Sequence, residues 1–374
     1  MIQPPQALEI HELVGIARDR WRDASARVST VPLELFVKLA MRRRVTRDAL
    51  GGGSSSASAL ESGLAVRSFF SSHGVAGFAS SSGLSSDALD WVVDTACANR
   101  GNTSASAPAV GFGVPELRED LDPASDLPDE VTLTHALKER PHAQWVEAGT
   151  TIEILVGIDG WVAARRRHRL WAFLETPEPH LVAQRGWKDW ERLLDVEPDA
   201  TGEPLILSPR AAAPVVAALA SAFHSPESSR PAQIGAGWAL ADQPGHPYGL
   251  TGGSFDDAGF PTTDRVLAGN GSWLGAVGGP GSYWRGTFRQ APKESFSNLV
   301  VSPAEAQTRP LPAAPVGRCR VMRLSPDVWV LELGRKWVRV HPAELLAACS
   351  EFLGTPQVTS EGPIVPAMVL TGLC

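Results

Sequence analysis

The residues best suited to chemistry lie in one short segment, Phe255–Pro261, which reads Phe-Asp-Asp-Ala-Gly-Phe-Pro. The carboxylates of Asp256 and Asp257 can accept hydrogen bonds from backbone N–H groups, Gly259 supplies free dihedral angles, and Pro261 fixes the exit of the chain. This pattern predicts a turn. Two roles stay open for it, a rigid corner between strands and a direct contact with a substrate.

Other catalytic patterns are weak. The sequence has no G-x-S-x-G elbow, and Gly253-Ser254-Phe255 lacks its spacing. The glycine-rich stretches 269–271 and 275–281 lack the Lys-Ser/Thr pair of a phosphate-binding loop. Neither a serine nucleophile nor a nucleotide site is predicted.

Cysteine and histidine give no clear metal or thiol site. The four cysteines are scattered, without a C-x-x-C pair: Cys97, Cys319, Cys349 and Cys374. Arginines on either side of Cys319 could lower its pKa, although packed thiols are the simpler interpretation. A degenerate metal site would need four distant residues to meet, which nothing in their spacing predicts: His224, His246, Cys319 and His341.

Composition limits the class of protein. At roughly 150 residues per domain, 374 residues suggest about two domains. A net charge of −7 offers no basic field for nucleic acid or for an anionic membrane. The apolar runs are shorter than the roughly 18 residues of a membrane helix, and the first residues lack the pattern of a signal peptide. Scattered cysteines favour a reducing, cytoplasmic location.

The first part of the chain predicts an α+β domain, residues 1–176. Apolar residues recur at helical spacing from Ile10 to Trp21, and residues 31–45 alternate as a strand does. Residues 51–58 predict a Gly/Ser loop, and short strands follow within 65–79. Ser85-Ser86-Asp87 predicts the N-cap of a helix that ends near Ala98.

A hairpin is predicted over Ile152–Leu174, with Asp159-Gly160 as its turn. Its returning strand carries a basic cluster, Arg165–Arg169, which a strand divides between two faces. A solvated edge is the favoured interpretation of this cluster, with an anion site as the alternative.

The second part, residues 177–374, predicts a β-rich domain with two helices. Ser208-Pro209 would open a helix over 211–223, and Pro342 and Gly354 would frame another over 343–352. Strands are expected at 205–207, 319–324, 328–333, 337–341 and 365–370.

Two stretches of the sequence resemble the TldD/PmbA family, whose PmbA branch is also called TldE. The stronger resemblance spans 242–303 and includes the acidic turn, and the second spans 63–89. The matching positions of the first stretch are Phe255, Asp256, Asp257, Gly259, Pro261, Thr262, Val266, Leu267, Asn270, Gly271, Ser297, Asn298 and Leu299. The order of the other segments also follows the family, except over 101–148 and 304–340.

The resemblance implies an N-terminal α+β domain and a β-rich, barrel-like C-terminal domain. In the catalytic TldD branch, the helix after the strand-Ser-Pro element carries HExxxH, whose histidines hold a metal beside a general base. Here residues 211–223 offer mostly alanine and valine, followed by the solitary His224. The sequence therefore resembles the PmbA/TldE branch, with no catalytic residue and no metal ligand expected in this chain.

The resemblance further implies a heterodimer with a TldD-like catalytic subunit that carries HExxxH and zinc. The substrate would be an unstructured peptide, such as the leader of a ribosomally made modified peptide. Six residues are expected to face the substrate or partner: Phe255, Asp256, Asp257, Gly259, Pro261 and Asn298. A self-sufficient hydrolase with an unrecognised site and a free-standing peptide-binding protein remain the alternatives.

Overall fold

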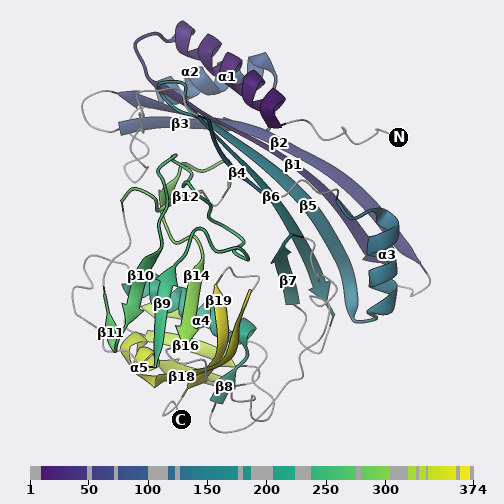
Figure 1. The fold of residues 1–374 in the computed structure, drawn as a ribbon, viewed down its shortest axis with the longest axis vertical. Coiled ribbons are helices and arrows are strands. Elements are labelled where there is room, and N and C mark those ends of the chain that lie inside the picture. The colour runs from purple at the N-terminus through teal and green to yellow at the C-terminus, as the bar shows by residue number, and fades with distance from the viewer. Residues whose placement is uncertain are drawn as a thin grey trace.

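The computed structural model divides into a long curved sheet with helices and a β-rich second half (Figure 1). It describes residues 10–48, 53–70, 75–99, 117–122, 127–175, 180–186, 205–223, 237–274, 279–285, 287–303, 319–325, 328–333, 336–358 and 363–370. The α+β class and the β-rich second half predicted from the sequence are confirmed.

The first sheet has the strand order β3-β2-β1-β5-β6-β4, with β7 also paired to β6. All its neighbours are antiparallel except β4 and β6. Its strands are β1 (Leu33–Arg47), β2 (Ser54–Phe70), β3 (Val75–Ser81), β4 (Leu117–Leu121), β5 (Ala143–Val156), β6 (Val162–Leu174) and β7 (His180–Arg185). The turn Asp159-Gly160 joins β5 to β6, as the sequence predicts.

One local prediction fails in this sheet. Residues 54–58 belong to β2 rather than to a loop, and Ser54 is paired with Arg47 of β1. Small polar side chains give little packing, but the backbone of β1 offers hydrogen-bond partners that extend the strand. Pairing with β1 therefore overrides the local Gly/Ser signal.

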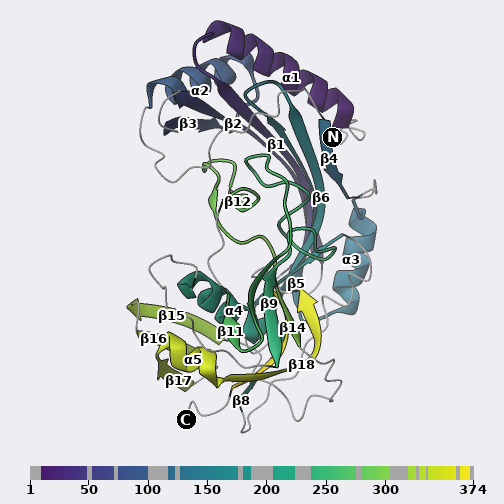
Figure 2. The same cartoon turned by 60° about the vertical axis from the view of Figure 1, so that its left-hand side comes forward.

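Three of the described helices cover the convex side of the curved first sheet (Figure 2). They are α1 (Ile10–Arg27), α2 (Ser86–Ala98) and α3 (Glu130–Glu139). The predicted cap of α2 is present, since Ser85 Oγ accepts from the N–H of Ala88 at 3.2 Å. Apolar residues of α1 and α2 form one core with the sheet, and α3 covers the other end of the same face.

The second half has its own sheet, in the order β11-β10-β9-β14-β19-β18, with β8 paired to β19. The strands of this sheet are β8 (Leu205–Leu207), β9 (Trp238–Asp242), β10 (Arg265–Gly269), β11 (Ser272–Trp273), β14 (Leu299–Pro303), β18 (Cys349–Val358) and β19 (Ile364–Leu370). A separate three-stranded sheet contains β15 (Cys319–Ser325), β16 (Val328–Leu333) and β17 (Lys336–Val340). The short pair β12 (Tyr283–Trp284) and β13 (Lys293–Glu294) lies on the concave side of the curved first sheet (Figure 2).

Two helices complete the described part of this half. α4 (Pro209–Phe223) packs against β19 and β15, in the place the sequence predicts. α5 (Pro342–Ala348) begins at the predicted proline but ends early, because Cys349 already pairs with Leu370 of β19. The helix expected over 343–352 is therefore wrong beyond Ala348.

The first sheet includes β7, and the second begins with β8. The domain boundary placed at residue 176 stays a prediction, since residues 176–179 lie outside the described part of the chain.

Among the described helices, none combines the length and apolarity that a membrane span requires.

Candidate functional site at the junction of the two halves

The acidic turn is built around Asp256, whose side chain is fully buried. Its Oδ1 accepts from the N–H groups of Ala258 and Phe260, each at 2.9 Å. Its Oδ2 accepts from the N–H groups of Gly281 at 2.9 Å and Tyr283 at 3.1 Å. Burial raises the pKa of Asp256 to about 6, against the opposing effect of these backbone donors. One carboxylate thus holds two separate segments together, which supports the rigid corner.

Gly259 allows the corner to approach the first half closely. It has φ of +91°, and a Cβ at this position would overlap the indole ring of Trp161. Trp161 is almost completely buried, and its ring also fills the space beside Gly157 of its own hairpin. Phe255, paired with Pro261 by an isolated bridge, belongs to the same apolar cluster. The corner is therefore packed on the β5–β6 hairpin.

Gly259→Ala is expected to cost about 3 kcal/mol of unfolding free energy, from backbone strain plus overlap with Trp161. Gly186→Ala is the matched control, because Gly186 has φ of +74° and, among the described residues, no atom lies within 4 Å of a Cβ built there. The control should cost only about 1 kcal/mol, the strain alone. Urea unfolding of both variants checks this, and equal losses would contradict the proposed packing.

Asp257 connects the corner to the basic strand. Its Oδ1 accepts from Arg165 Nη1 at 2.8 Å, and its Oδ2 accepts from the N–H of Arg285 at 2.6 Å. Arg165 Nη2 also donates to the carbonyl of Phe255 at 2.6 Å. Burial disfavours the Arg165 cation, but the charges of Asp257 and Glu153 outweigh it, so the pKa of Arg165 is raised.

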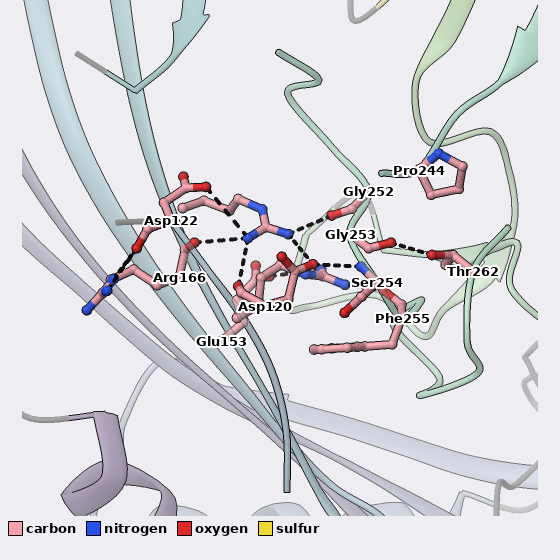
Figure 3. Close-up of polar contacts among 12 residues, drawn as sticks. Asp120, Asp122, Glu153, Arg166, Pro244, Gly252, Gly253, Ser254, Phe255 and Thr262 are labelled. Atoms are coloured by element: carbon pink, nitrogen blue, oxygen red, sulfur yellow. Dashed lines mark hydrogen bonds and ion pairs between the residues drawn. The ribbon is translucent and has the colours of Figure 1, made fainter. Parts of the chain in front are cut away.

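The alternate arginines of β6 continue this contact, and Figure 3 shows Asp120 and Gly252, two of the residues that accept from Arg167. Arg167 donates to the carbonyl of Gly252 at 3.2 Å and to Asp120 Oδ2 at 2.5 Å, and Arg169 donates to the carbonyl of Leu250. Burial and the nearby Arg165 charge lower the pKa of Arg167 to about 10. We call Arg165, Arg167 and Arg169 the arginine row.

The structure corrects the interpretation of the basic cluster as a solvated edge. Arg165 and Arg167 are buried, with exposed fractions of 6% and 3%. Both lie under residues 252–257 of the second half, because the carbonyl groups of Gly252 and Phe255 and the carboxylate of Asp257 accept their hydrogen bonds. Arg166 points to the other face of the strand and donates to the carbonyl of Asp122 at 2.8 Å.

Asn298 holds the loop that follows β9. Its Oδ1 accepts from the N–H of Thr251 at 3.1 Å, and its Nδ2 donates to the carbonyl groups of Thr251 at 2.6 Å and Gln243 at 3.2 Å. Asp242 in turn accepts from the N–H of Asn298 at 3.0 Å. This buried network sets the path of the loop that meets the arginine row.

The structure brings five of the six predicted residues into the interior. Phe255, Asp256, Asp257, Gly259 and Asn298 are buried, whereas Pro261 is exposed. Their observed contacts are all within the chain, so a direct contact with substrate or partner stays a prediction.

Sequence reasoning missed several residues of this junction. Glu34 and Arg67 form a fully buried ion pair, with Arg67 Nε donating to Glu34 Oε1 at 2.8 Å, and Arg285 Nη2 reaches the same oxygen at 3.3 Å. Burial lowers the pKa of Arg285 to about 10. In the sequence, the alternation of residues 33–40 places Glu34 and Phe36 on the same face of a strand. This alternation does not indicate which residues pair with Glu34.

A pocket of about 320 Å³ opens beside the arginine row, between the two halves. Its walls come from β4, β7 and the loops of the second half: Asp120, Arg185, Pro244, Gly245, Gly253, Ser254, Thr262, Thr263 and Asp264. Most of the lining residues have polar side chains or are glycines, which present only backbone atoms. Figure 3 shows Asp120, Gly253 and Ser254 side by side at this place.

No protein-family model matches the sequence, and no curated protein gives a significant match. Solved structures do match. TldE from Thermococcus kodakarensis is 14% identical with a TM-score of 0.61, over 96% of this chain and 98% of that one. The chain has the TldE fold.

Two further structures agree over similar lengths. A proposed modulator of DNA gyrase from Thermotoga maritima is 14% identical with a TM-score of 0.58, over 95% of this chain and 98% of that one. Another, from Bacteroides thetaiotaomicron, is 14% identical with a TM-score of 0.60, over 99% and 98%. The TldE fold thus includes both halves of the chain.

Within this TldE fold, α4 is packed on nearly all sides. Seven of its residues have exposed fractions of 4% or less: Ala211, Ala212, Ala213, Val215, Val216, Leu219 and Ala220. Ser221 near its end is exposed. From Pro209 to Phe223 it has no side chain that binds metal ions well. His224 lies outside the described residues.

Burial suppresses the ionisation of two of the described cysteines, Cys319 and Cys349. Burial raises the pKa of Cys319 to about 12, so the neighbouring arginines do not activate it. Burial also raises the pKa of Cys349 to about 12. In the described part of the chain, no three His, Cys, Asp or Glu side chains cluster as metal ligands would.

Proposed function

We propose that the chain is a TldE-like member of the TldD/PmbA family and the non-catalytic subunit of a two-subunit metallopeptidase. The catalytic zinc and general base would come from a TldD-like partner with HExxxH. The observation that carries the proposal is α4, whose residues Pro209–Phe223 offer packing surface where the catalytic branch needs ligands.

The role of this subunit would be to complete the chamber that holds the peptide. An extended, flexible peptide is held poorly by an open surface, and a displacement of about 1 Å at the reacting bond can cost roughly a hundredfold in rate. The buried ion pairs and the Asp256 corner fix the loop region relative to the curved sheet. A fixed junction of this kind suits a subunit that positions substrate for its partner. The cytoplasm is the proposed location, since the free cysteines suit a reducing compartment.

The test is reconstitution with a TldD-like protein that carries HExxxH, sought in the same genome. We expect this chain alone to be inactive, the partner alone to be weak, and the mixture to cleave an unstructured peptide, as followed by mass spectrometry. A chelator should abolish cleavage by the mixture. Elemental analysis should find well under one equivalent of zinc in this chain alone.

Two outcomes would contradict the proposal. Cleavage by this chain alone, insensitive to chelator, would identify a self-sufficient hydrolase. Failure of the two proteins to associate, together with tight peptide binding by this chain, would identify a free-standing peptide-binding protein.

A further inference from the structure

The pocket between the two halves contains an acceptor that the fold does not use. Asp120 Oδ2 accepts from Arg167 Nη2 at 2.5 Å and from the N–H of Ser254 at 2.7 Å. Its Oδ1 accepts no hydrogen bond from the described residues, although the side chain lines the pocket. The hydrogen bond and charge of Arg167 outweigh burial and lower the pKa of Asp120, so this oxygen belongs to an anion at neutral pH.

A second carboxylate, Asp264, lines the same pocket and is exposed. It forms no ion pair with any residue that the structure describes. Burial lowers the pKa of the nearby His246, and the charge of Asp264 opposes this shift only in part. The pocket thus has anionic groups from both halves of the chain, one fixed by Arg167 and one free.

Arg185 supplies a hydrogen-bond donor to the pocket, in contrast to the acceptors of the two carboxylates. Its Nε and Nη2 donate to Asp122 Oδ1 at 2.9 and 2.5 Å, which fixes the guanidinium plane. Its Nη1 has no acceptor among the described residues, and the side chain lines the pocket. A residue with a fixed guanidinium group therefore lines the same pocket as the two carboxylates.

We propose that this pocket binds the amino terminus of a peptide. The α-ammonium group would bind Asp120 Oδ1 and Asp264, and the first carbonyl group would accept from Arg185 Nη1. A volume of about 320 Å³ is at the small end of ligand pockets and suits one or two residues. This inference rests on the proposed function, because it specifies which part of a peptide substrate the subunit holds.

Two alternatives share part of this chemistry. A lysine side chain has the ammonium group without the adjacent carbonyl, and a free α-amino acid has both but lacks the rest of the peptide. A divalent cation is disfavoured, since Asp120 and Asp264 gain no third carboxylate, histidine or thiolate ligand among the described residues.

The experiment measures binding of an unstructured Gly/Ser/Ala decapeptide, labelled at its C-terminus, to the full chain by fluorescence anisotropy. The same peptide is compared with its N-acetylated form and with an acetylated form that contains one internal lysine. We expect the free amine to bind about tenfold more tightly than either acetylated peptide, as a charge-assisted hydrogen bond at a partly exposed site would give.

Asp264→Asn should reduce this ratio toward one without disturbing the fold, because Asp264 makes no described ion pair. Asp23→Asn is the control, since Asp23 is also exposed and lies on α1, outside the pocket. The control should keep the tenfold ratio.

Three results would overturn the inference: equal or undetectable binding of the free and acetylated peptides, recovery of tight binding by the internal lysine, and displacement by free alanine at the affinity of the peptide. These results would leave the subunit assignment intact, because that assignment depends on cleavage by the reconstituted pair. An inactive mixture would likewise leave the binding ratio unaffected.

Discussion

Arg165→Ala is expected to lower the unfolding free energy by about 3–5 kcal/mol, the usual cost of removing one partner of a buried ion pair. The loss leaves Asp257 buried without its cation and the carbonyl of Phe255 without a donor. Since Arg165 joins the curved sheet to the second half, the two halves should also unfold less cooperatively. Urea denaturation with circular dichroism and tryptophan fluorescence measures both effects.

Arg22→Ala is the control for this experiment. Arg22 forms an exposed pair with Asp19 on α1 at 3.0 Å, so its loss should cost less than about 1 kcal/mol. Arg165→Lys should remain well below wild-type stability, because an ammonium group cannot reproduce the two-sided contact with Asp257 and Phe255. Wild-type stability of Arg165→Ala would show that the junction does not depend on this arginine.

Asp256→Ala is expected to cost about 4 kcal/mol or more. The substitution leaves four N–H donors of Ala258, Phe260, Gly281 and Tyr283 without their acceptor, and a buried unsatisfied group costs about 1–3 kcal/mol. Local rearrangement and entry of water would recover part of the sum. Thermal and urea unfolding test the expected loss.

Asp129→Ala is the matched substitution for comparison. Asp129 is the N-cap of α3 and accepts from the N–H of Thr132 at 2.7 Å in an exposed place, so its loss should lower the unfolding free energy much less than Asp256→Ala does. In the two-subunit enzyme that we propose, Asp256→Ala should lower cleavage about tenfold or more at unchanged zinc content, because the loop that it fixes would be misplaced. Loss of zinc from the mixture would instead point to a failure of assembly.

Patterns within the sequence determined those features that depend on neighbouring residues. The turn at Asp159-Gly160, the N-cap of α2 and the start of α4 after Ser208 all follow from local backbone chemistry, and all are present. The acidic turn is also local, since Asp256 accepts from N–H groups two and four residues ahead. The absence of metal ligands from residues 211–223 is a property of composition and needs no coordinates.

Tertiary structure alone decided which surfaces meet. A strand pattern places Arg165, Arg167 and Arg169 on one face, but it cannot say whether that face meets water or carbonyl groups from about 80–90 residues later in the chain. The serines of β2 and the early end of α5 were likewise decided by pairing with another strand, β1 in the first case and β19 in the second. Local propensities differ by fractions of a kcal/mol per residue, whereas unpaired backbone groups and buried unpaired charges cost several. The arrangement at the junction therefore follows from partners that the linear sequence does not identify.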